Sequence, residues 1–398
     1  MLAGTWPNFS KEEAAAVQGV ILSNKVNYWT GTECREFEKE FAAWVGTEFA
    51  VAVANGTLAL DLALKALNIS HGDEVIVTPR TFLASASCIV NAGAIPIFAD
   101  VDRESQNITA ETVRAVLTPR TKAIICVHLA GWPCDMDPIM ALADEHGLFV
   151  IEDCAQAHGA RYKGRMVGSI GHIGAWSFCQ DKIMTTGGEG GMVTTNSRTW
   201  WSRMWSFKDH GKSWEAMYER EHAPGYRWVH DGFGTNWRML ETQAVLGRLQ
   251  LQKMPAWTAQ RQSNARQIAA ACKRFPVVRL PALPADVEHA FYKFYVFVEP
   301  DKLAPGWSRD RIAHEISERG VPCAQGTCSE LYLEQAFDNT GYRPKHRLTV
   351  ARELGETSLM FLVHPSLTDE DIDRTCQVIE EVLSMAERKI RQEAQALS

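Results

Sequence analysis

The 398-residue chain contains no run of apolar residues that approaches the length of a membrane span. Residues 1–7 lack the basic start and the apolar run of a signal peptide. We therefore expect a cytoplasmic protein with no membrane partner. Positive charge is not in excess, since 41 Lys and Arg stand against 48 Asp and Glu. The net charge of −7 argues against broad nucleic-acid binding, so local groups must hold any anionic ligand.

Metal-binding patterns and repeats are missing too. The twelve histidines form no His-Glu-x-x-His pair or similar spacing, and Cys323 and Cys328 lack the second pair that a zinc site needs. We expect no bound metal. Without a signal peptide, the ten cysteines are expected to be free thiols. The chain shows no internal repeat and no low-complexity segment.

The strongest chemical signal lies around Lys182, which follows Ser177 and precedes a glycine-rich cluster at 187–191. Upstream, an apolar run ends in Glu152 and Asp153. Each of these features alone is more often a surface lysine, a loop or a helix cap. Together they match a pyridoxal phosphate enzyme, in which a lysine forms a Schiff base and a carboxylate keeps the ring nitrogen protonated. The combination predicts this cofactor.

Strand-like and helical segments alternate through the first two-thirds of the chain. Helices are expected at 57–67, 82–92, 107–117 and 137–146, and strands at 74–78, 95–101, 122–129 and 148–152. This alternation predicts an α/β fold with a mostly parallel sheet that is covered by helices on both faces. Ligands of such sheets bind at the carboxyl ends of the strands, where Asp153 lies.

The last third of the chain has its own pattern. A helix at 238–251 followed by Pro255 predicts a boundary between a large cofactor-binding domain, 1–252, and a small C-terminal domain, 253–398. The small domain is expected to contain a strand at 291–298, a helix at 308–319 that ends at Gly320, and an amphipathic helix that starts at Thr368 and includes Ile390.

A series of motifs in one order resembles the DegT/DnrJ/EryC1/StrS family of sugar aminotransferases, from about Phe37 to the C-terminal helix. The motifs occupy residues 55–60, 72–77, 81–82, 93–102, 152–159, 177–191 and 233–239, followed by Gln243, Ala244 and Gly247. The resemblance implies the type I fold of pyridoxal phosphate-dependent transferases. This fold has a large domain with a mostly parallel mixed sheet sandwiched by helices, and a smaller C-terminal α+β domain.

The resemblance also implies the site residues. Lys182 matches the Schiff-base lysine, which also moves protons, and Asp153 matches the acid that pairs with the pyridinium nitrogen. These two are the expected catalytic residues. The expected cofactor-binding residues are Gly56, Thr57, Phe82, Asp153, Gln156, Ser177, Lys182 and Asn236.

Their expected roles differ. Gly56 and Thr57, at a helix N-terminus, would bind the cofactor phosphate together with Ser177. Gln156 would lie near the ring oxygen, and Phe82 would stack on the ring, although an apolar core position is its main alternative.

Asn236 matches an asparagine that reaches the cofactor phosphate of a neighbouring subunit. This match implies a homodimer with shared active sites. A local helix cap is the alternative for Asn236.

The implied reaction moves an amino group from L-glutamate or L-glutamine to a keto or aldehyde sugar, most often nucleotide-linked, through pyridoxamine phosphate. Such products enter surface glycans or other amino-sugar compounds. One alternative is a sugar dehydratase of the same fold, but such relatives carry histidine in place of Lys182. The other alternative is a regulatory relative that binds the cofactor without catalysis.

Two segments depart from the family pattern. Residues 321–332 lack the Tyr-Pro-Pro-Leu-His type of substrate segment, so the resemblance does not extend to the usual nucleotide-sugar contacts there. Residues 195–226 are rich in tryptophan and are interpreted equally as a packed helix surface or as a subunit contact or lid. Nearby Lys208, Lys212 and Arg227 are interpreted as solvated charges rather than as a site for an acidic group.

Overall fold

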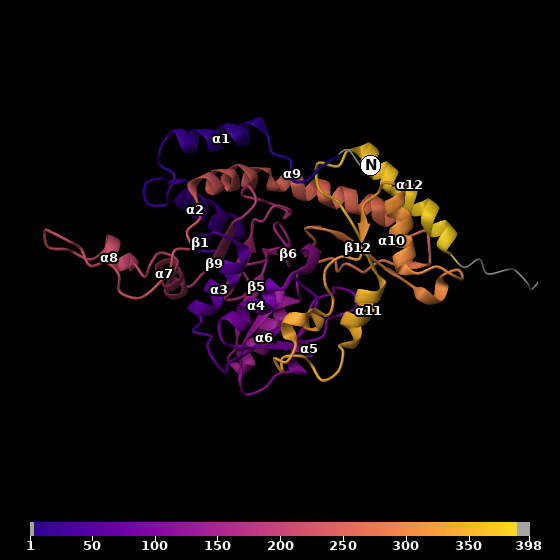
Figure 1. The fold of residues 1–398 in the computed structure, drawn as a ribbon, viewed down its shortest axis with the longest axis horizontal. Coiled ribbons are helices and arrows are strands. Elements are labelled where there is room, and N and C mark those ends of the chain that lie inside the picture. Colours follow the sequence, from indigo (N-terminus) through magenta and orange to yellow (C-terminus); the bar gives the residue numbers. More distant parts are fainter. Residues whose placement is uncertain (1–3, 388–398) are drawn as a thin grey trace, which may run out of the picture.

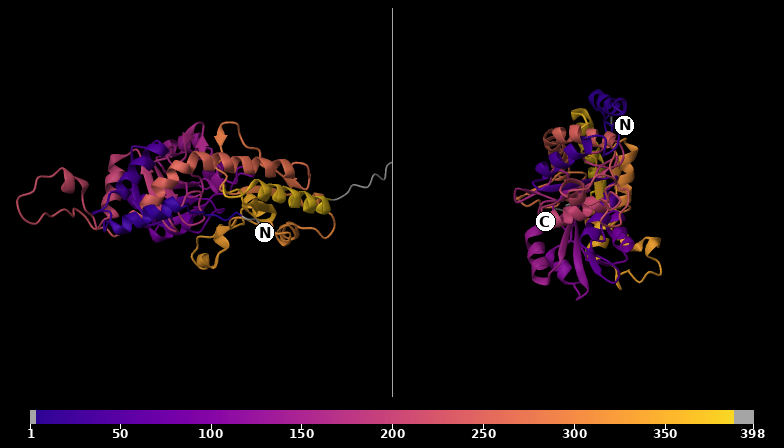
Figure 2. Two further views of the ribbon diagram at one scale, coloured as in Figure 1. Left: turned by 90° about the horizontal axis from the view of Figure 1, so that it is seen from above. Right: turned by 90° about the vertical axis from the view of Figure 1, so that its left-hand side faces the viewer.

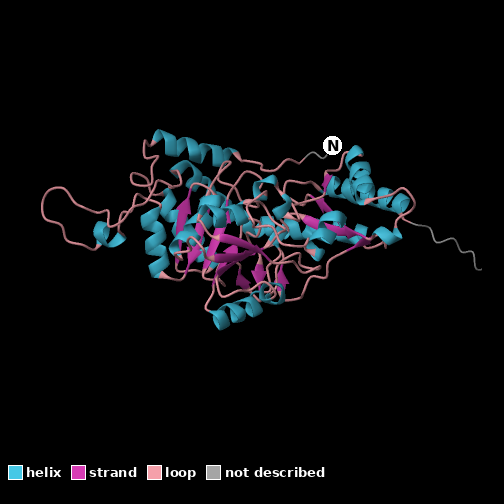
Figure 3. Ribbon diagram, turned by 60° about the horizontal axis from the view of Figure 1, so that its bottom comes forward, coloured by secondary structure: helices cyan, strands magenta, loops and turns pink. Residues whose placement is uncertain are grey.

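The computed structural model describes residues 4–387, and a seven-stranded sheet forms its centre, as Figures 1 and 3 show. Its strands run in the order β1-β9-β8-β5-β4-β2-β3, and all neighbours are parallel except the two pairs that include β9. The predicted mostly parallel mixed sheet is confirmed. The strands are β1 (Phe49–Val53), β2 (Glu74–Val77), β3 (Ile95–Phe98), β4 (Thr121–Val127), β5 (Phe149–Asp153), β8 (Ile173–Ser177) and β9 (Gly191–Thr195).

Helices cover both faces of this sheet. The four predicted helices are α3 (Gly56–Ala66), α4 (Ala84–Asn91), α5 (Ala110–Arg114) and α6 (Met136–His146). Further helices are α1 (Lys11–Leu22), α2 (Glu33–Val45), α7 (Arg198–Phe207) and α8 (Trp214–Tyr218). Because successive strand residues face opposite sides, Val75 and Val77 pack in the core beneath α3 and α4, while Ile76 packs beneath α6.

A smaller antiparallel sheet forms the C-terminal part. Its order is β10-β12-β14-β13, with strands β10 (Val278–Arg279), β12 (Phe294–Val298), β13 (Cys323–Ala324) and β14 (Ser358–Phe361). Helices α10 (Arg309–Glu318), α11 (Thr349–Thr357) and α12 (Asp369–Ala386) accompany it. Thr368 opens α12 through a capping box, and Gly320 follows α10 in a left-handed conformation with φ 82°, both as predicted. Ile390 lies outside the described residues.

A third, three-stranded sheet joins distant parts of the chain. β11 (Val287–Glu288) pairs with β6 (Arg161–Tyr162), which also pairs with β7 (Arg165–Met166). The pairing links the segment before β12 to the connection between β5 and β8 of the large sheet.

The predicted end of the helix at residue 251 is wrong. α9 (Glu241–Cys272) continues through Pro255, although a proline inside a helix costs about 3 kcal/mol. Packing on both sides outweighs this cost: Gly247 lies so close to Phe37 that a Cβ there would be 2.5 Å from its ring, and Ile268 is buried in the small-domain core. Pro255 itself is exposed. The division at 252/253 stays a prediction and falls inside α9, which runs past both sheets (Figures 1 and 2).

The tryptophan-rich segment has a packed base and a projecting tip. Trp201 and Trp205 pack against Trp214, with ring centroids 4.9 and 5.1 Å apart, so the packed-surface interpretation is confirmed for them. The chain around α8 projects away from the body (Figures 1 and 2) and exposes Tyr226 and Trp228. A subunit contact or lid stays a prediction for this tip.

Lys208 corrects the expectation of solvated charge in this segment. Its side chain is fully buried, its Nζ lies 2.9 Å from Glu38 Oε1, and it faces the ring of Tyr28. Lys212 also pairs, with Asp209 at 3.1 Å, whereas Arg227 is exposed. The two lysines therefore hold the base of the segment in place.

All ten cysteines are free. Within residues 4–387, no helix combines the length and the apolar character that crossing a membrane requires.

Candidate active site

A cavity of about 670 Å³ opens at the carboxyl ends of β5 and β8. Seven of the eight predicted cofactor-binding residues line it: Gly56, Thr57, Phe82, Asp153, Gln156, Ser177 and Lys182. They come from the start of α3, the segment before α4, the end of β5 with the loop after it, and the end of β8 with the loop after it. The sheet therefore brings residues that are far apart in sequence to one place, as expected for the strand ends of an α/β fold.

Lys182 lies in the loop after β8 and is fixed by its backbone. Its N–H donates to the carbonyl of Cys179 at 3.1 Å, and its own carbonyl accepts from Trp6 Nε1 at 2.8 Å. Its Nζ lies 5.2 Å from the ring centre of Tyr292 and forms no ion pair among the described residues. The amine is therefore left for another partner in the cavity.

Asp153 ends β5 and points into the same cavity. Its carboxylate accepts from Ser85 Oγ at 2.8 Å and from the N–H of Ala155 at 3.1 Å. Burial raises the pKa of Asp153, against the opposing effects of these hydrogen bonds and of the Lys182 charge. Within the described part of the chain no cation pairs with Asp153. A protonated ring nitrogen would supply the missing positive charge.

The N-terminus of α3 forms an anion-binding corner. Asn55 caps the helix, because its side chain accepts from the N–H of Leu58 at 3.0 Å. The N–H groups of Gly56 and Thr57 have no partner among the described residues. Ser177 crosses close to this turn, since a Cβ on Gly56 would lie 2.5 Å from Ser177 Cβ. Free N–H groups, a helix dipole and a hydroxyl suit a phosphate.

Phe82 and Gln156 form further walls of the cavity. Phe82 is 68% exposed, so its alternative as a core residue is wrong. Gln156 Oε1 accepts from the N–H of Ala130 at 2.9 Å. Ala130 has a left-handed backbone conformation with φ 57°. Because its N–H donates to Gln156 Oε1, the oxygen of the Gln156 side-chain amide is the occupied end. The Nε2 group of Gln156 is then the donor that remains for a ligand.

The profile of the DegT/DnrJ/EryC1/StrS aminotransferase family matches residues 7–380. The chain belongs to this family. An aminotransferase structure from Psychrobacter cryohalolentis is 63% identical, with a TM-score of 0.95, and the match covers 96% of this chain and 99% of that one. GDP-perosamine synthase of Escherichia coli O157:H7 is 36% identical over 91% of this chain and 92% of its own length. A UDP-N-acetyl-3-dehydro-alpha-D-glucosamine 3-aminotransferase of Acidithiobacillus ferrooxidans is also 36% identical, over 94% of both chains.

Aminotransferases of the DegT/DnrJ/EryC1/StrS family depend on pyridoxal phosphate. The residues of this chain fit that cofactor at three points: an anion-binding helix turn, a buried carboxylate without a cation, and a lysine without an ion pair. All three line one cavity. The chain therefore has the groups that a pyridoxal phosphate site requires.

The sequence patterns missed several residues of this site. Ser85 orients the carboxylate of Asp153, and only its position four residues after Thr81, at the start of α4, hints at this role. Tyr292 comes from the segment before β12 and its hydroxyl donates to Asp181, next to Lys182. No local pattern marks Tyr292, because its place at the cavity depends on how the small domain packs.

The segment that lacks the expected family motif also reaches the cavity. Gly326 and Thr327 line it, and the N–H of Thr327 donates to Tyr295 Oη at 3.0 Å. Gly326, with φ 92°, lies where any Cβ would collide with the ring of Tyr295. The backbone of this segment thus approaches the site closely at Gly326.

Asn236 lies outside this cavity on an exposed stretch. Its Oδ1 accepts from the N–H of Arg238 at 3.5 Å, and the residue that caps α9 is Leu240. The helix-cap alternative for Asn236 is therefore wrong. Its role at a neighbouring subunit stays a prediction.

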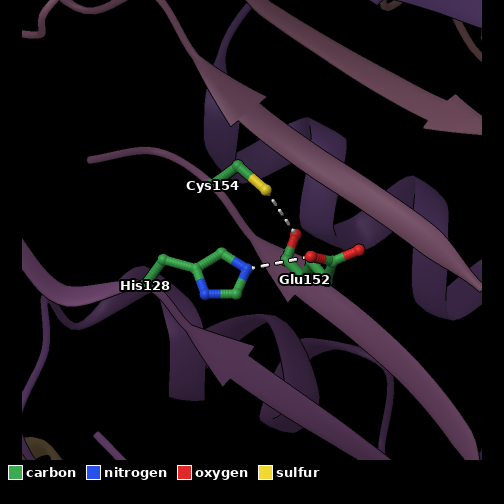
Figure 4. Close-up of side chains that lie close together, drawn as sticks. All are labelled: His128, Glu152 and Cys154. Carbon is green, nitrogen blue, oxygen red and sulfur yellow. Dashed lines mark hydrogen bonds and ion pairs between the residues drawn. The ribbon is translucent and has the colours of Figure 1, made fainter. Parts of the chain in front are cut away.

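Behind the site lies a buried cluster of His128, Glu152 and Cys154, which Figure 4 shows. Glu152 accepts from His128 Nε2 at 3.0 Å, while His128 Nδ1 accepts from the N–H of Cys134 at 3.0 Å. The other carboxylate bonds come from the N–H groups of Gly168, Ile170 and Gly171, at 2.8, 2.8 and 2.6 Å. These bonds occupy the Glu152 carboxylate and both ring nitrogens of His128, which a metal would need, and Cys154 Sγ donates to the Glu152 carbonyl at 3.6 Å. We therefore interpret the cluster as a structural support.

Proposed function

We propose that this protein transfers an amino group from L-glutamate or L-glutamine to a keto or aldehyde group of a nucleotide-linked sugar. The observation that carries the proposal is the placement of Asp153 and Lys182 in one cavity beside an anion-binding helix turn. Transfer of an amine to a sugar also agrees with the names of the relatives, which are sugar aminotransferases or synthases.

In this proposal each residue has a separate task. Lys182 holds the cofactor through Nζ and later moves a proton at the reacting carbon. Asp153 keeps the ring nitrogen protonated, and Ser85 holds the Asp153 carboxylate in position. Gly56, Thr57 and Ser177 bind the phosphate. When bound, pyridoxal phosphate supplies an electron-withdrawing ring that stabilises negative charge beside the amine.

The acceptor, subunit state and compartment belong to the same proposal. A cavity of about 670 Å³ has room for a cofactor and a sugar. A homodimer is proposed because Asn236, matched to a residue that serves a neighbouring site, is exposed and forms a backbone bridge with Asp209. The cytoplasm is proposed because ten unpaired thiols suit a reducing compartment.

Both alternatives have specific objections. A dehydratase of this fold would carry histidine where this chain has Lys182. A regulatory protein that only binds the cofactor has little need of a lysine whose amine faces the cavity unpaired. The presence of turnover with any amino donor separates the last alternative from the proposal.

The first test is the visible absorption spectrum of the purified protein with pyridoxal phosphate, before and after L-glutamate and then L-glutamine. We expect a band of lysine-bound cofactor that bleaches with one donor. A protein that shows no band after pyridoxal phosphate is supplied contradicts the cofactor assignment, and a band that neither donor bleaches contradicts the proposed donors.

The second test changes the lysine. Lys182→Ala is expected to abolish transfer while pyridoxamine phosphate still binds, because the phosphate turn and Asp153 remain. Lys163→Ala is the matched control, since Lys163 is a surface lysine paired with Asp137 away from the cavity. Normal turnover in Lys182→Ala would show that the lysine assignment is wrong.

A further inference from the structure

Arg261 of α9 is a buried cation with an unused hydrogen-bonding edge. Its side chain is 1% exposed. Nη1 lies 3.3 and 3.4 Å from the carbonyl oxygens of Phe291 and Tyr292, to which it donates. Nε and Nη2 have no hydrogen-bond partner among the described residues, and no carboxylate of residues 4–387 pairs with the guanidinium. A buried charge without an anion is costly, so this edge calls for an anionic partner.

A second cavity of about 260 Å³ has Arg261 in its lining. Besides Arg261, its walls include Trp6, His364 and Lys293. Asp181, Tyr292 and Lys293 line both this cavity and the larger one that contains Lys182. The small cavity is therefore a side chamber of the proposed active site, and we call it the Arg261 chamber.

Positive charge dominates the Arg261 chamber. Lys293 forms no ion pair in the described part of the chain, and burial, with the charges of Arg261 and Lys182, lowers its pKa. Burial lowers the pKa of His364 to about 4, which leaves this residue neutral at pH 7. The acidic group of the chamber is Asp181, whose carboxylate already accepts from the Tyr292 hydroxyl. One more anion would balance the two cations.

The walls hold the guanidinium in a fixed orientation. Trp6 lies over Arg261, with the ring centre 5.0 Å from Cζ, and its Nε1 donates to the carbonyl of Lys182 at 2.8 Å. The same indole stacks on His364 at 6.0 Å. Trp6 thus ties the chamber wall directly to the loop that carries the reactive lysine.

We propose that the Arg261 chamber binds a carboxylate of the amino donor, with Arg261 Nε and Nη2 donating side by side to its two oxygens and Lys293 adding a third contact. Two parallel N–H groups match the spacing of a carboxylate. The volume of about 260 Å³ suits an amino-acid side chain better than a nucleotide. This inference rests on the proposed transfer from an amino acid and assigns two residues to its donor.

The test is a calorimetric titration of the holoenzyme with glutarate, a five-carbon dicarboxylate that has no amine to react. Arg261→Gln is expected to weaken glutarate binding about 10- to 100-fold, as for the loss of a charged hydrogen-bonded pair. Lys293→Gln should weaken it by a smaller factor. Arg266→Gln, on the exposed side of the same helix, removes the same charge and should leave the affinity unchanged.

Two further arms separate the outcomes. UDP and GDP are titrated as probes of the acceptor, and their affinities should not change in Arg261→Gln, because Arg261 does not line the larger cavity. Weakened UDP or GDP binding with unchanged glutarate binding would overturn the inference in favour of an acceptor contact. Equal glutarate affinity in the wild type and both variants, or a wild type that binds no glutarate at millimolar concentration, would also overturn it.

Failure of this inference is distinct from failure of the proposed function. If only the chamber assignment is wrong, the wild type and Arg261→Gln keep the absorption band and bleach equally with donor. If the cofactor assignment is wrong, the wild type shows no band at all. Should Arg261→Gln not fold, Lys293→Gln still tests the chamber, because Lys293 lies at the rim shared by the two cavities.

Discussion

Glu152 and Asp153 are neighbours at the end of β5, and both carboxylates are buried, yet one supports the fold and the other faces the proposed active site. Glu152 accepts four hydrogen bonds, from His128 and three backbone N–H groups. Asp153 accepts two and faces the cavity. Successive strand residues point to opposite sides of the sheet, so one carboxylate meets a closed loop and the other an open site.

The pKa directions follow from these surroundings. Burial opposes ionisation of both groups, but at Glu152 the hydrogen bonds from His128 and the backbone prevail and lower the pKa. At Asp153 burial prevails over fewer hydrogen bonds and raises the pKa. A buried carboxylate whose acceptor sites are filled supports the fold. One that is left incomplete retains binding capacity for a cationic ligand.

Of the changes that test this comparison, Asp153→Asn has the largest expected effect. The amide keeps the shape but loses the charge that would pair with the ring nitrogen, so transfer should fall about 100- to 1000-fold. Initial rates with saturating pyridoxal phosphate measure this loss. An Asp153→Asn enzyme that retains wild-type kcat would show that the carboxylate is not required.

The same variant tests stability in the cofactor-free protein. Because the folded state raises the pKa of Asp153, its ionised form destabilises the fold increasingly as pH rises from the unfolded-state pKa toward the folded-state pKa. Asp153→Asn should therefore have a higher Tm than the wild type at pH 7, and this advantage should disappear at acid pH. A lower Tm at pH 7 would contradict the burial argument.

Glu152→Gln should produce the reverse result, with loss of stability and retained chemistry. In the wild type, backbone N–H groups donate to both carboxylate oxygens of Glu152. In the variant, the amide NH₂ group would replace one of these oxygens and face N–H donors that it cannot accept from, which should lower the free energy of unfolding by about 2 to 4 kcal/mol. Since the fold lowers the pKa of Glu152, this contribution is present above the unfolded-state pKa and is lost as pH falls through the folded-state pKa.

Denaturant unfolding at pH 7 and at acid pH measures the effect of Glu152→Gln. Glu145→Gln, on the exposed face of α6, is the matched control and should leave unfolding unchanged. If Glu152→Gln lowered kcat per folded molecule as strongly as Asp153→Asn, the division of work between the two carboxylates would be wrong.

Ser85→Ala should have a smaller effect on the chemistry. The Ser85 hydroxyl donates to Asp153 and lowers its pKa, so its removal raises that pKa further. The acid limb of the pH–rate profile should move to higher pH, and activity at pH 7 should fall about fivefold, the equivalent of one hydrogen bond. Ser87→Ala, a serine on α4 that does not contact Asp153, is the control. An unmoved acid limb in Ser85→Ala would contradict the positioning role.

Local patterns predicted much of this arrangement. The alternation of strands and helices, the cap at Thr368 and the position of Asp153 at a strand end all follow from neighbouring residues. Two features do not: the helix through Pro255 and the burial of Lys208 depend on distant packing partners. Strand alternation predicts that Glu152 and Asp153 point to opposite faces of the sheet. It does not predict that the loop at 168–171 donates hydrogen bonds to the Glu152 carboxylate and none to that of Asp153.

The smallest expected effect is that of metal removal. Ligand atoms of His128, Glu152 and Cys154 lie within 4.8 Å of one another, a spacing that a metal ion could bridge. Metal binding would break the hydrogen bond between His128 and Glu152 and those from three backbone N–H groups to Glu152. The buried donors would then have no acceptor, which is unfavourable. Dialysis against a chelator should therefore leave the Tm unchanged, and elemental analysis after exposure to zinc should find less than one equivalent. A stoichiometric metal that binds the wild type and is lost from a Cys154→Ala variant would show that the cluster is a metal site rather than a structural support.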